Sequence, residues 1–181
     1  LRNIVRKSAK LTKYGQLLFR MVNYFQPETI VELGTSVGLT SCYLASANKN
    51  ATLFTLEGAP ALAKVAKENF DKIELKNVHQ IVGNFEETLP QFLTSIQAID
   101  FVFFDGNHRK LPTLSYFKLF LEKVTEKSVF VFDDIYWSAE MMEAWEEIKR
   151  HPDVTLTLDF YSLGMVFFRK ELSKENFVIN Y

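Results

Sequence analysis

The sequence predicts an α/β fold of three layers, in which helices cover both faces of a mostly parallel sheet. Short apolar runs alternate along the chain with segments of helical spacing, which is the pattern of parallel strands joined by helices. Phenylalanine supplies 17 of the 181 residues and gathers in three runs, at Phe101–Phe104, Phe130–Phe132 and Phe167–Phe168. Such runs are typical of strands buried on both faces, as a parallel sheet requires.

The first strand and the turn after it fix where the other elements belong. Residues 29–33 form a short apolar run that contains Glu32, and two glycines follow four positions apart, at Gly34 and Gly38. A helix is expected over residues 38–47. Free N–H groups and the positive end of the helix dipole meet at such a junction, so it favours a polar small molecule.

An amphipathic helix is expected before this strand, and further strands and helices alternate after it. Apolar residues recur at helical spacing over residues 11–25, and Pro27 ends the pattern. Pro60 and Pro112 fit the first turns of two helices, whereas Pro90 inside another predicts a break or a late start. The expected elements are strands at 52–56, 78–82, 99–104 and 128–132, and helices at 59–71, 85–96 and 111–124.

The C-terminal third is expected to end in a hairpin. Ser138 can cap a helix that runs to about residue 150. Two short apolar runs, at 154–158 and 165–168, are joined by a turn at 162–164, which predicts an antiparallel pair at the edge of a seven-stranded sheet. We therefore expect one domain over residues 1–181, with an N-terminal helical segment at 1–26 and the sheet core at 27–181.

Composition limits the classes of partner. The formal net charge is −1, which gives no general attraction to nucleic acid or to anionic membranes, and no apolar run is long enough to span a bilayer. A single cysteine, Cys42, favours a reducing compartment, so we expect a cytoplasmic protein. The basic residues that precede the first acid are Arg2, Arg6, Lys7, Lys10, Lys13 and Arg20. They form either a solvated helix face or a surface that attracts an acidic substrate or RNA.

Polar residues or glycines stand at the ends of the first five predicted strands. Because the carboxyl ends of parallel strands lie along one edge, about 4.8 Å apart, these residues predict a ligand site at that edge. They are Glu32, Gly34, Glu57, Gly83, Asn84, Asp105, Asp133 and Asp134.

Glu57 is the most informative of these residues. It follows Gly34 by 23 residues and ends the second strand, where an acid accepts hydrogen bonds from a ribose diol. The same carboxylate could instead cap the next helix. A dinucleotide fingerprint would place glycine where this chain has Ser36, so a nucleoside without a pyrophosphate fits better.

The segment Val31-Glu32-Leu33-Gly34-Thr35-Ser36-Val37-Gly38 resembles motif I of class I S-adenosylmethionine-dependent methyltransferases. The resemblance continues through Glu57, Gly83-Asn84 and Asp105. It implies a Rossmann-like methyltransferase fold with strand order 3-2-1-4-5-7-6 and an antiparallel seventh strand. It also implies that the cofactor is held by Glu32, Gly34, Thr35, Ser36, Gly38, Thr40, Glu57, Gly58, Asn84, Phe85 and Asp105.

Two later segments, at 101–105 and 133–137, are similar to the catechol and caffeoyl-CoA O-methyltransferase group. This resemblance implies a divalent cation such as Mg²⁺ on Asp105, Asp133 and Asp134, whose oxygens suit a hard ion. The chain departs from the group at two positions, with Asp134 in place of asparagine and His108 in place of lysine. Without a metal, Asp134 would cap the next helix and Asp105 would contact only the cofactor.

Asp105 and His108 are the expected catalytic residues. Imidazole titrates near neutral pH, so His108 could take a proton from an acceptor hydroxyl, contact a metal or the substrate, or be a plain loop residue. Tyr14, Gly15 and Trp137 are candidates for the pocket wall.

The expected activity is methyl transfer to a hydroxyl oxygen of a small-molecule acceptor, without a membrane or nucleic-acid partner; a homodimer stays open. A module that binds S-adenosylmethionine without catalysis is the first alternative. The remote alternative is an α/β-hydrolase, because Gly34-Thr35-Ser36-Val37-Gly38 also matches G-x-S-x-G around Ser36, with His151 later in the chain.

Overall fold

The computed structural model describes residues 12–181, and the contacts between residues divide the chain into two compact units. The first unit ends at Gln91 and the second begins at Phe92, so the boundary falls within one helix. The expectation of one domain stays a prediction. Four of the basic residues named above, Arg2, Arg6, Lys7 and Lys10, lie outside the described residues.

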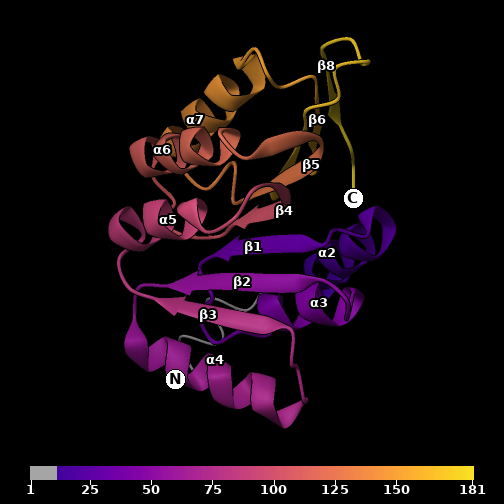
Figure 1. Cartoon of the computed structure of the whole chain (residues 1–181). Coiled ribbons are helices and arrows are strands. Elements are labelled where there is room, and N and C mark those ends of the chain that lie inside the picture. Colours follow the sequence, from indigo (N-terminus) through magenta and orange to yellow (C-terminus); the bar gives the residue numbers. More distant parts are fainter. Residues whose placement is uncertain (1–11) are drawn as a thin grey trace. The chain divides into compact units, whose positions relative to one another are not determined.

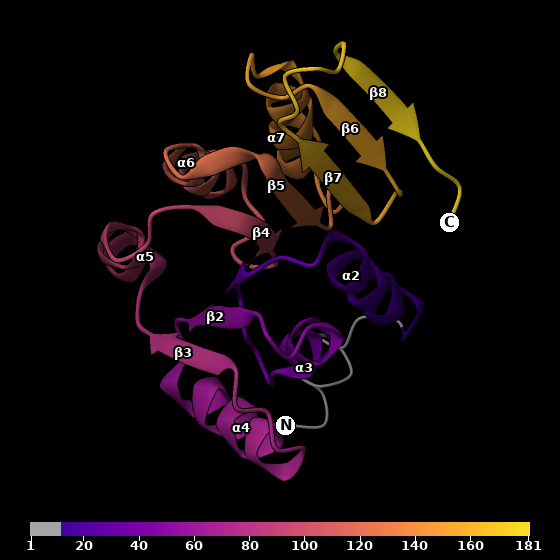
Figure 2. The same ribbon diagram turned by 45° about the vertical axis from the view of Figure 1, so that its right-hand side comes forward.

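The first unit is a parallel three-stranded sheet with helices packed against it. Strand β1 is hydrogen-bonded to β2, and β2 to β3, so the strand order is β3-β2-β1 (Figure 1). Helices α3 and α4 both contact β2 and also contact each other, so they cover the same face of these strands (Figure 2). The elements are α2 (Thr12–Phe25), β1 (Thr29–Leu33), α3 (Leu39–Ala47), β2 (Thr52–Glu57), α4 (Pro60–Lys72), β3 (Val78–Val82) and α5 (Phe85–Thr94).

Helix α2 packs on α3 through a glycine. A Cβ at Gly15 would lie 2.6 Å from the ring of Tyr43, so only glycine lets the two helices approach this closely. Leu18 and Val22, on the same helix, are fully buried. The observed role of Gly15 is therefore helix packing; the expectation that it walls a ligand pocket stays a prediction.

The prediction for α5 was partly wrong. The helix begins at Phe85 and continues through Pro90, with neither the break nor the late start that this proline suggested. Pro90 is the sixth helical residue, so its missing N–H removes only one hydrogen bond near the start of the helix. Leu89 and Phe92 are buried on either side of it, and this packing offsets that loss.

The second unit is a mixed sheet with strand order β4-β5-β7-β6-β8. The pairs β4–β5 and β6–β8 are parallel, whereas β7 runs antiparallel to both of its neighbours (Figure 2). The α/β class and the antiparallel C-terminal hairpin are confirmed. The elements are β4 (Ile99–Phe104), α6 (Lys110–Leu121), β5 (Val124–Asp133), α7 (Ala139–Arg150), β6 (Leu156–Asp159), β7 (Leu163–Phe167) and β8 (Glu175–Val178).

Aromatic rings fill the core of the second unit. Phe104 of β4 stacks on Phe132 of β5, with ring centroids 4.2 Å apart. Phe117 of α6 meets Phe132 edge-on, and Trp145 of α7 lies against the same ring. Both helices therefore seal one face of these strands, and the burial of so many rings accounts for the high phenylalanine content.

Several boundaries in this unit were predicted incorrectly. Helix α6 ends at Leu121 instead of residue 124, and β5 begins four residues early, at Val124. The extra residues form a bulge against β4, in which the Ser128 hydroxyl donates to the Ile99 carbonyl oxygen at 2.5 Å. The hairpin turn lies at residues 160–162 rather than 162–164, since the N–H of Phe160 donates to the carbonyl oxygen of Leu163.

The described residues contain eight strands where the sequence predicted seven. Strand β8 was missed because all four of its residues are exposed, so no apolar alternation marks it. It is held by main-chain pairing with β6 instead. The N–H of Glu175, for example, donates to the carbonyl oxygen of Thr155.

Ser138 caps α7 as predicted, accepting a hydrogen bond from the N–H of Met141 at 3.2 Å. A Ser138→Ala variant is expected to lose about 1 kcal/mol of unfolding free energy, because that N–H then lacks its acceptor. Urea unfolding followed by circular dichroism measures the loss. Ser138→Asp keeps an acceptor and is expected to unfold close to the wild type, so equal losses in both variants would contradict the cap.

Candidate functional site

In the first unit, the turn between β1 and α3 is held in a left-handed backbone conformation. Gly34, Ser36 and Gly38 have φ values of 101°, 49° and 80°. The N–H groups of Gly34 and Thr35 both donate to the carbonyl oxygen of Leu56, at 2.9 and 3.1 Å, which ties the turn to the end of β2. Ser36 is the only one of the three left-handed residues with a side chain, so the turn carries strain at that position.

Gly38 is required by packing as well as by its backbone angle. A Cβ there would lie 2.6 Å from the Phe70 ring and 3.0 Å from the Cβ of Ala66, both in α4. Because Gly38 is the residue that precedes α3, its close contact with α4 fixes where α3 begins. The glycine spacing in the sequence therefore has a packing reason in addition to room for a ligand.

Glu32 lies beneath this turn and is fully buried. The hydroxyls of Ser41 and Thr55 both donate to its Oε2, the second at 2.6 Å. Thr55 is the direct register partner of Glu32 on the neighbouring strand. The hydroxyl of Thr35 lies 2.5 Å from that of Thr55, and since Thr55 gives its proton to Glu32, Thr35 is the donor. Glu32 thus connects the turn to β2 and α3 through these hydroxyl groups.

Glu57 bridges two loops with its two carboxylate oxygens. Oε2 accepts the N–H of Ser36 at 2.7 Å, and Oε1 accepts the N–H of Ala59 at 2.8 Å. The sequence left two roles for this residue, a ribose contact and a helix cap. Ala59 is the N-cap residue of α4, and the helix has no side-chain cap, so the bond to Ala59 fixes the loop after β2 and does not cap the helix. Each oxygen of Glu57 keeps a further lone pair for a diol.

The loop after β3 completes the polar edge of this unit. Gly83 has φ 150°, and its N–H donates to the carbonyl oxygen of Glu57 at 2.9 Å. The Asn84 side chain accepts the N–H of Glu86 in the first turn of α5. Gly58 and Asn84 are exposed, whereas Thr35 and Thr40 are buried under the turn. The candidate cofactor-binding residues therefore have two roles. The exposed ones can contact a ligand directly, whereas the buried ones support the turn.

In the second unit, Asp105, His108 and Asp133 come together. Each offers one ligand atom, and these atoms all lie within 4.8 Å of one another. The Nε2 atom of His108 is 3.6 Å from Oδ1 of Asp105, and Asp133 is almost fully buried at 3% exposure. Of the three metal ligands that the resemblance implied, Asp134 is not in the group that the described residues form. Its backbone is left-handed at φ 52°, and its N–H donates to the carbonyl oxygen of Ser162.

His108 is carried by a tight loop. Asn107 has φ 54°, and the N–H of Arg109 donates back to the carbonyl oxygen of Asn107 at 2.5 Å, closing a three-residue turn centred on His108. Helix α6 starts immediately afterwards, at Lys110.

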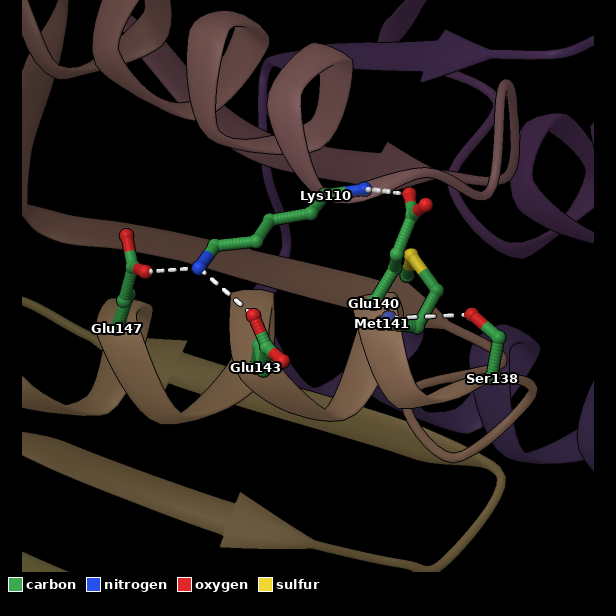
Figure 3. A network of polar contacts seen from close by, with 6 residues as sticks. All are labelled: Lys110, Ser138, Glu140, Met141, Glu143 and Glu147. Atoms are coloured by element: carbon green, nitrogen blue, oxygen red, sulfur yellow. Dashed lines mark hydrogen bonds and ion pairs between the residues drawn. The ribbon is translucent and has the colours of Figure 1, made fainter.

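Lys110 fixes the end of this loop to α7, as Figure 3 shows. Its ammonium contacts Glu147 at 2.5 Å and Glu143 at 2.9 Å. The main-chain N–H of Lys110 donates to the carboxylate of Glu140. The two carboxylates, Glu147 first, raise the pKa of Lys110. Several charges on one ammonium hold the start of α6 better than a single exposed pair would.

Sequence reasoning missed an aromatic surface beside β5. The rings of Tyr136 and Tyr161 stack 5.4 Å apart, and the Tyr136 hydroxyl donates to Asp159 at 2.5 Å. This hydrogen bond, with burial, raises the pKa of Tyr136 to about 12. Trp137 is 73% exposed next to this pair. In the sequence, only the run Ile135-Tyr136-Trp137 could have indicated this aromatic surface, because Tyr161 and Asp159 belong to the hairpin of β6 and β7.

Neither Cys42 nor His151 has the surroundings of a catalytic group. Burial and the charge of Glu32 raise the pKa of the Cys42 thiol to about 11, and the side chain lies with Phe19 and Tyr43 along an apolar pocket. The Nδ1 atom of His151 accepts the N–H of Asp153 at 3.4 Å, and its ring meets Phe117 edge-on. His151 is thus engaged in packing, which disfavours the hydrolase alternative. Among residues 12–181, the helices are all too short or too polar to traverse a bilayer.

Comparison with known proteins adds to this geometry. A protein family described as a methyltransferase domain matches residues 31–135, which is more than half of the chain. A catechol O-methyltransferase of Niastella koreensis is 30% identical over 132 residues, which cover 71% of this chain and 59% of the relative. The chain thus spans less than two thirds of that relative.

Solved structures resemble the fold at lower identity. The O-methyltransferase TomG of Streptomyces achromogenes, solved in complex with SAM, has a TM-score of 0.78 at 22% identity, covering 90% of this chain and 82% of TomG. An O-methyltransferase of Bacillus cereus in complex with SAH has a TM-score of 0.75 at 20% identity, covering 88% and 83%. At these identities the likeness is one of fold, and it extends over nearly the whole chain.

Proposed function

Because this chain belongs to the methyltransferase-domain family, we propose that it transfers a methyl group from S-adenosylmethionine to a hydroxyl oxygen of a small molecule. The observation that carries the proposal is the carboxylate of Glu57, which binds the N–H of Ser36 in the glycine turn and that of Ala59 before α4. An acid at the end of the second strand, joined to the turn after the first, is the arrangement that binds an adenosyl group.

The first unit supplies the residues for the methyl donor. Glu57 would accept hydrogen bonds from the ribose hydroxyls, and Gly58, Asn84 and Phe85 would border the adenine. The turn at 34–38, with Glu32 and Thr40 beneath it, would bind the amino-acid end, because its left-handed residues turn backbone groups outward. Because Gly34 and Gly38 have no side chains, a ligand can approach the main chain of this turn closely.

The second unit supplies the residues for the acceptor. In the proposed reaction the acceptor hydroxyl loses its proton, its oxygen forms a bond to the methyl carbon, and the bond from that carbon to sulfur breaks to leave S-adenosylhomocysteine. We assign the activation of the acceptor hydroxyl, whose proton passes to solvent, to the group Asp105, His108 and Asp133. When bound, S-adenosylmethionine supplies a methyl group activated by the positive sulfur, and alignment of the two reactants lowers most of the barrier.

A Glu57→Gln variant tests the donor side. We expect it to bind S-adenosylhomocysteine about 10- to 100-fold more weakly, because a hydrogen bond to a charged group is worth about 1.5–3 kcal/mol. Isothermal titration calorimetry measures the affinity, and thermal melting checks that the variant folds. Glu68→Gln, an exposed acid on α4, is the matched control and is expected to bind like the wild type. Equal affinities in all three proteins would contradict the role of Glu57.

Activity is tested with a panel of hydroxylated small molecules and S-adenosylmethionine carrying a labelled methyl group. Label transferred to oxygen supports the proposal, whereas binding of the donor without any transfer supports the non-catalytic module instead. Three expectations from the sequence stay predictions: a single domain, a cytoplasmic location and a homodimer. Light scattering on the purified chain measures the last of these.

A further inference from the structure

We propose that Asp105, His108 and Asp133 bind one divalent transition-metal ion, with the imidazole of His108 as a ligand. The resemblance to metal-dependent O-methyltransferases implied an all-oxygen set of three acids that suits Mg²⁺. In this chain, the group that the described residues bring together contains a nitrogen donor and leaves Asp134 out. The kind of metal therefore differs from the expectation drawn from the sequence.

The spacing of the three side chains fits one shared ion. Ligand atoms about 2.1 Å from a metal lie about 3 Å apart when adjacent and about 4.2 Å apart when opposite. The Nε2 atom of His108 and Oδ1 of Asp105 are 3.6 Å apart, beyond hydrogen-bond length but inside this range. All three ligand atoms lie within 4.8 Å of one another, so a small movement of the side chains brings each one to an ion.

The chemistry of the donors selects the metal. Two carboxylates carry the charge that balances a divalent cation, and Asp133 is almost fully buried, so a bound cation would offset the cost of its burial. Mg²⁺ and Ca²⁺ prefer oxygen ligands only. Imidazole suits Zn²⁺, Co²⁺, Ni²⁺ and Fe²⁺, and Mn²⁺ accepts a mixed set. One histidine with two aspartates therefore favours a transition metal.

Local structure explains why His108, and not Asp134, joins the group. Asp134 is part of a turn in which its N–H donates to Ser162 and its carbonyl oxygen accepts the N–H of Trp137. Its backbone is left-handed, with φ 52°, directly after the last residue of β5. The loop of His108 is fixed instead by its own tight turn and by the ion pairs of Lys110 in Figure 3. The histidine is therefore held in place before a metal arrives.

Metal binding stands independently, but its use in catalysis rests on the proposed function. When bound at this group, a divalent ion would lower the pKa of an acceptor hydroxyl and orient it. His108 then acts as a ligand, so the proton leaves to solvent and not to its imidazole.

The test uses the full chain after metal removal by a chelator. Co²⁺, Mn²⁺, Zn²⁺ and Mg²⁺ are each titrated by calorimetry, and Co²⁺ is also followed by its visible absorption. We expect the transition metals to bind at least about tenfold more tightly than Mg²⁺. For the wild type we expect the visible absorption of bound Co²⁺ to indicate a nitrogen ligand. Equal or tighter binding of Mg²⁺, or no metal binding at all, would overturn the proposal.

Variants identify the ligands. His108→Gln and Asp133→Asn are expected to weaken Co²⁺ binding by at least about tenfold, because even residues behind the ligands contribute that much. Asp134→Asn and His79→Gln are expected to stay within about twofold of the wild type, since neither residue belongs to the group. If Asp134→Asn lost Co²⁺ binding and His108→Gln kept it, the ligands would be the three acids and the proposal would be overturned. Circular dichroism checks that each variant is folded.

Failure of this inference and failure of the proposed function give different results. Co²⁺ binding that depends on His108, without binding of S-adenosylhomocysteine, supports the metal site and contradicts the methyl-donor site. Methyl transfer at full rate in excess chelator, without a Co²⁺ spectrum, supports the methyl-donor site and overturns the metal site.

Discussion

An Asp105→Asn variant is expected to lose a factor on the order of 10² to 10³ in kcat, which is the usual effect of removing one group that stabilises charge in a transition state. Asp105 follows the last residue of β4 and shares a group with His108 and Asp133. The substitution keeps the size of the side chain and removes its negative charge. Single-turnover transfer of a labelled methyl group measures the chemical step, and calorimetry with S-adenosylhomocysteine separates binding from it.

Asp71→Asn is the matched control for this variant. Asp71 is an exposed acid on α4 that pairs with Lys67, so its loss is expected to change kcat by less than about twofold. A kcat for Asp105→Asn equal to that of the control would contradict the assignment of Asp105. Equal thermal melting of both variants would show that the loss is one of catalysis and not of folding.

Gly38→Ala is expected to cost about 2–6 kcal/mol of unfolding free energy. Two causes add, since φ is +80° and a Cβ would lie 2.6 Å from the Phe70 ring. Strain of a left-handed residue and overpacking each cost about 1–3 kcal/mol. Urea unfolding followed by fluorescence and circular dichroism measures the loss.

Gly58→Ala is the matched control for stability. The nearest atom to a Cβ at Gly58 is the carbonyl oxygen of Gly83, at 3.9 Å, so the methyl group has room. Its unfolding free energy is expected to stay within about 0.5 kcal/mol of the wild type. If both glycine variants were equally stable, the close packing of the turn against α4 would not contribute to stability.

The sequence predicted the first unit well because its signals are local. The apolar run at 29–33 and the spacing of Gly34 and Glu57 fix a strand, a turn and the end of the next strand, and the structure has each of them. What the sequence could not predict is the contact of Glu32 with Ser41 and Thr55. That contact depends on the register of β1 against β2, which is set by pairing across the sheet.

In the second unit, backbone geometry determines which of the predicted site residues come together, and the sequence pattern could not predict this. Asp133 and Asp134 are adjacent in the sequence, yet only Asp133 joins Asp105 and His108, because the chain turns sharply at Asp134. Strand β8 and the Tyr136–Tyr161 pair escaped prediction for a related reason. Both depend on segments of the C-terminal hairpin that pair through main-chain bonds or stacking, which leave no periodic pattern in the sequence.

Nuclear magnetic resonance of the nitrogen-labelled chain tests whether the turn at 34–38 and Glu57 bind one adenosyl group. Titration with S-adenosylhomocysteine is expected to shift the amide signals of Gly34, Ser36, Gly38 and Ala59, since Glu57 accepts two of these N–H groups and the others lie in the turn. If saturating amounts leave these signals unmoved, the chain does not bind the methyl donor through this turn, and the proposed methyl-donor site is wrong.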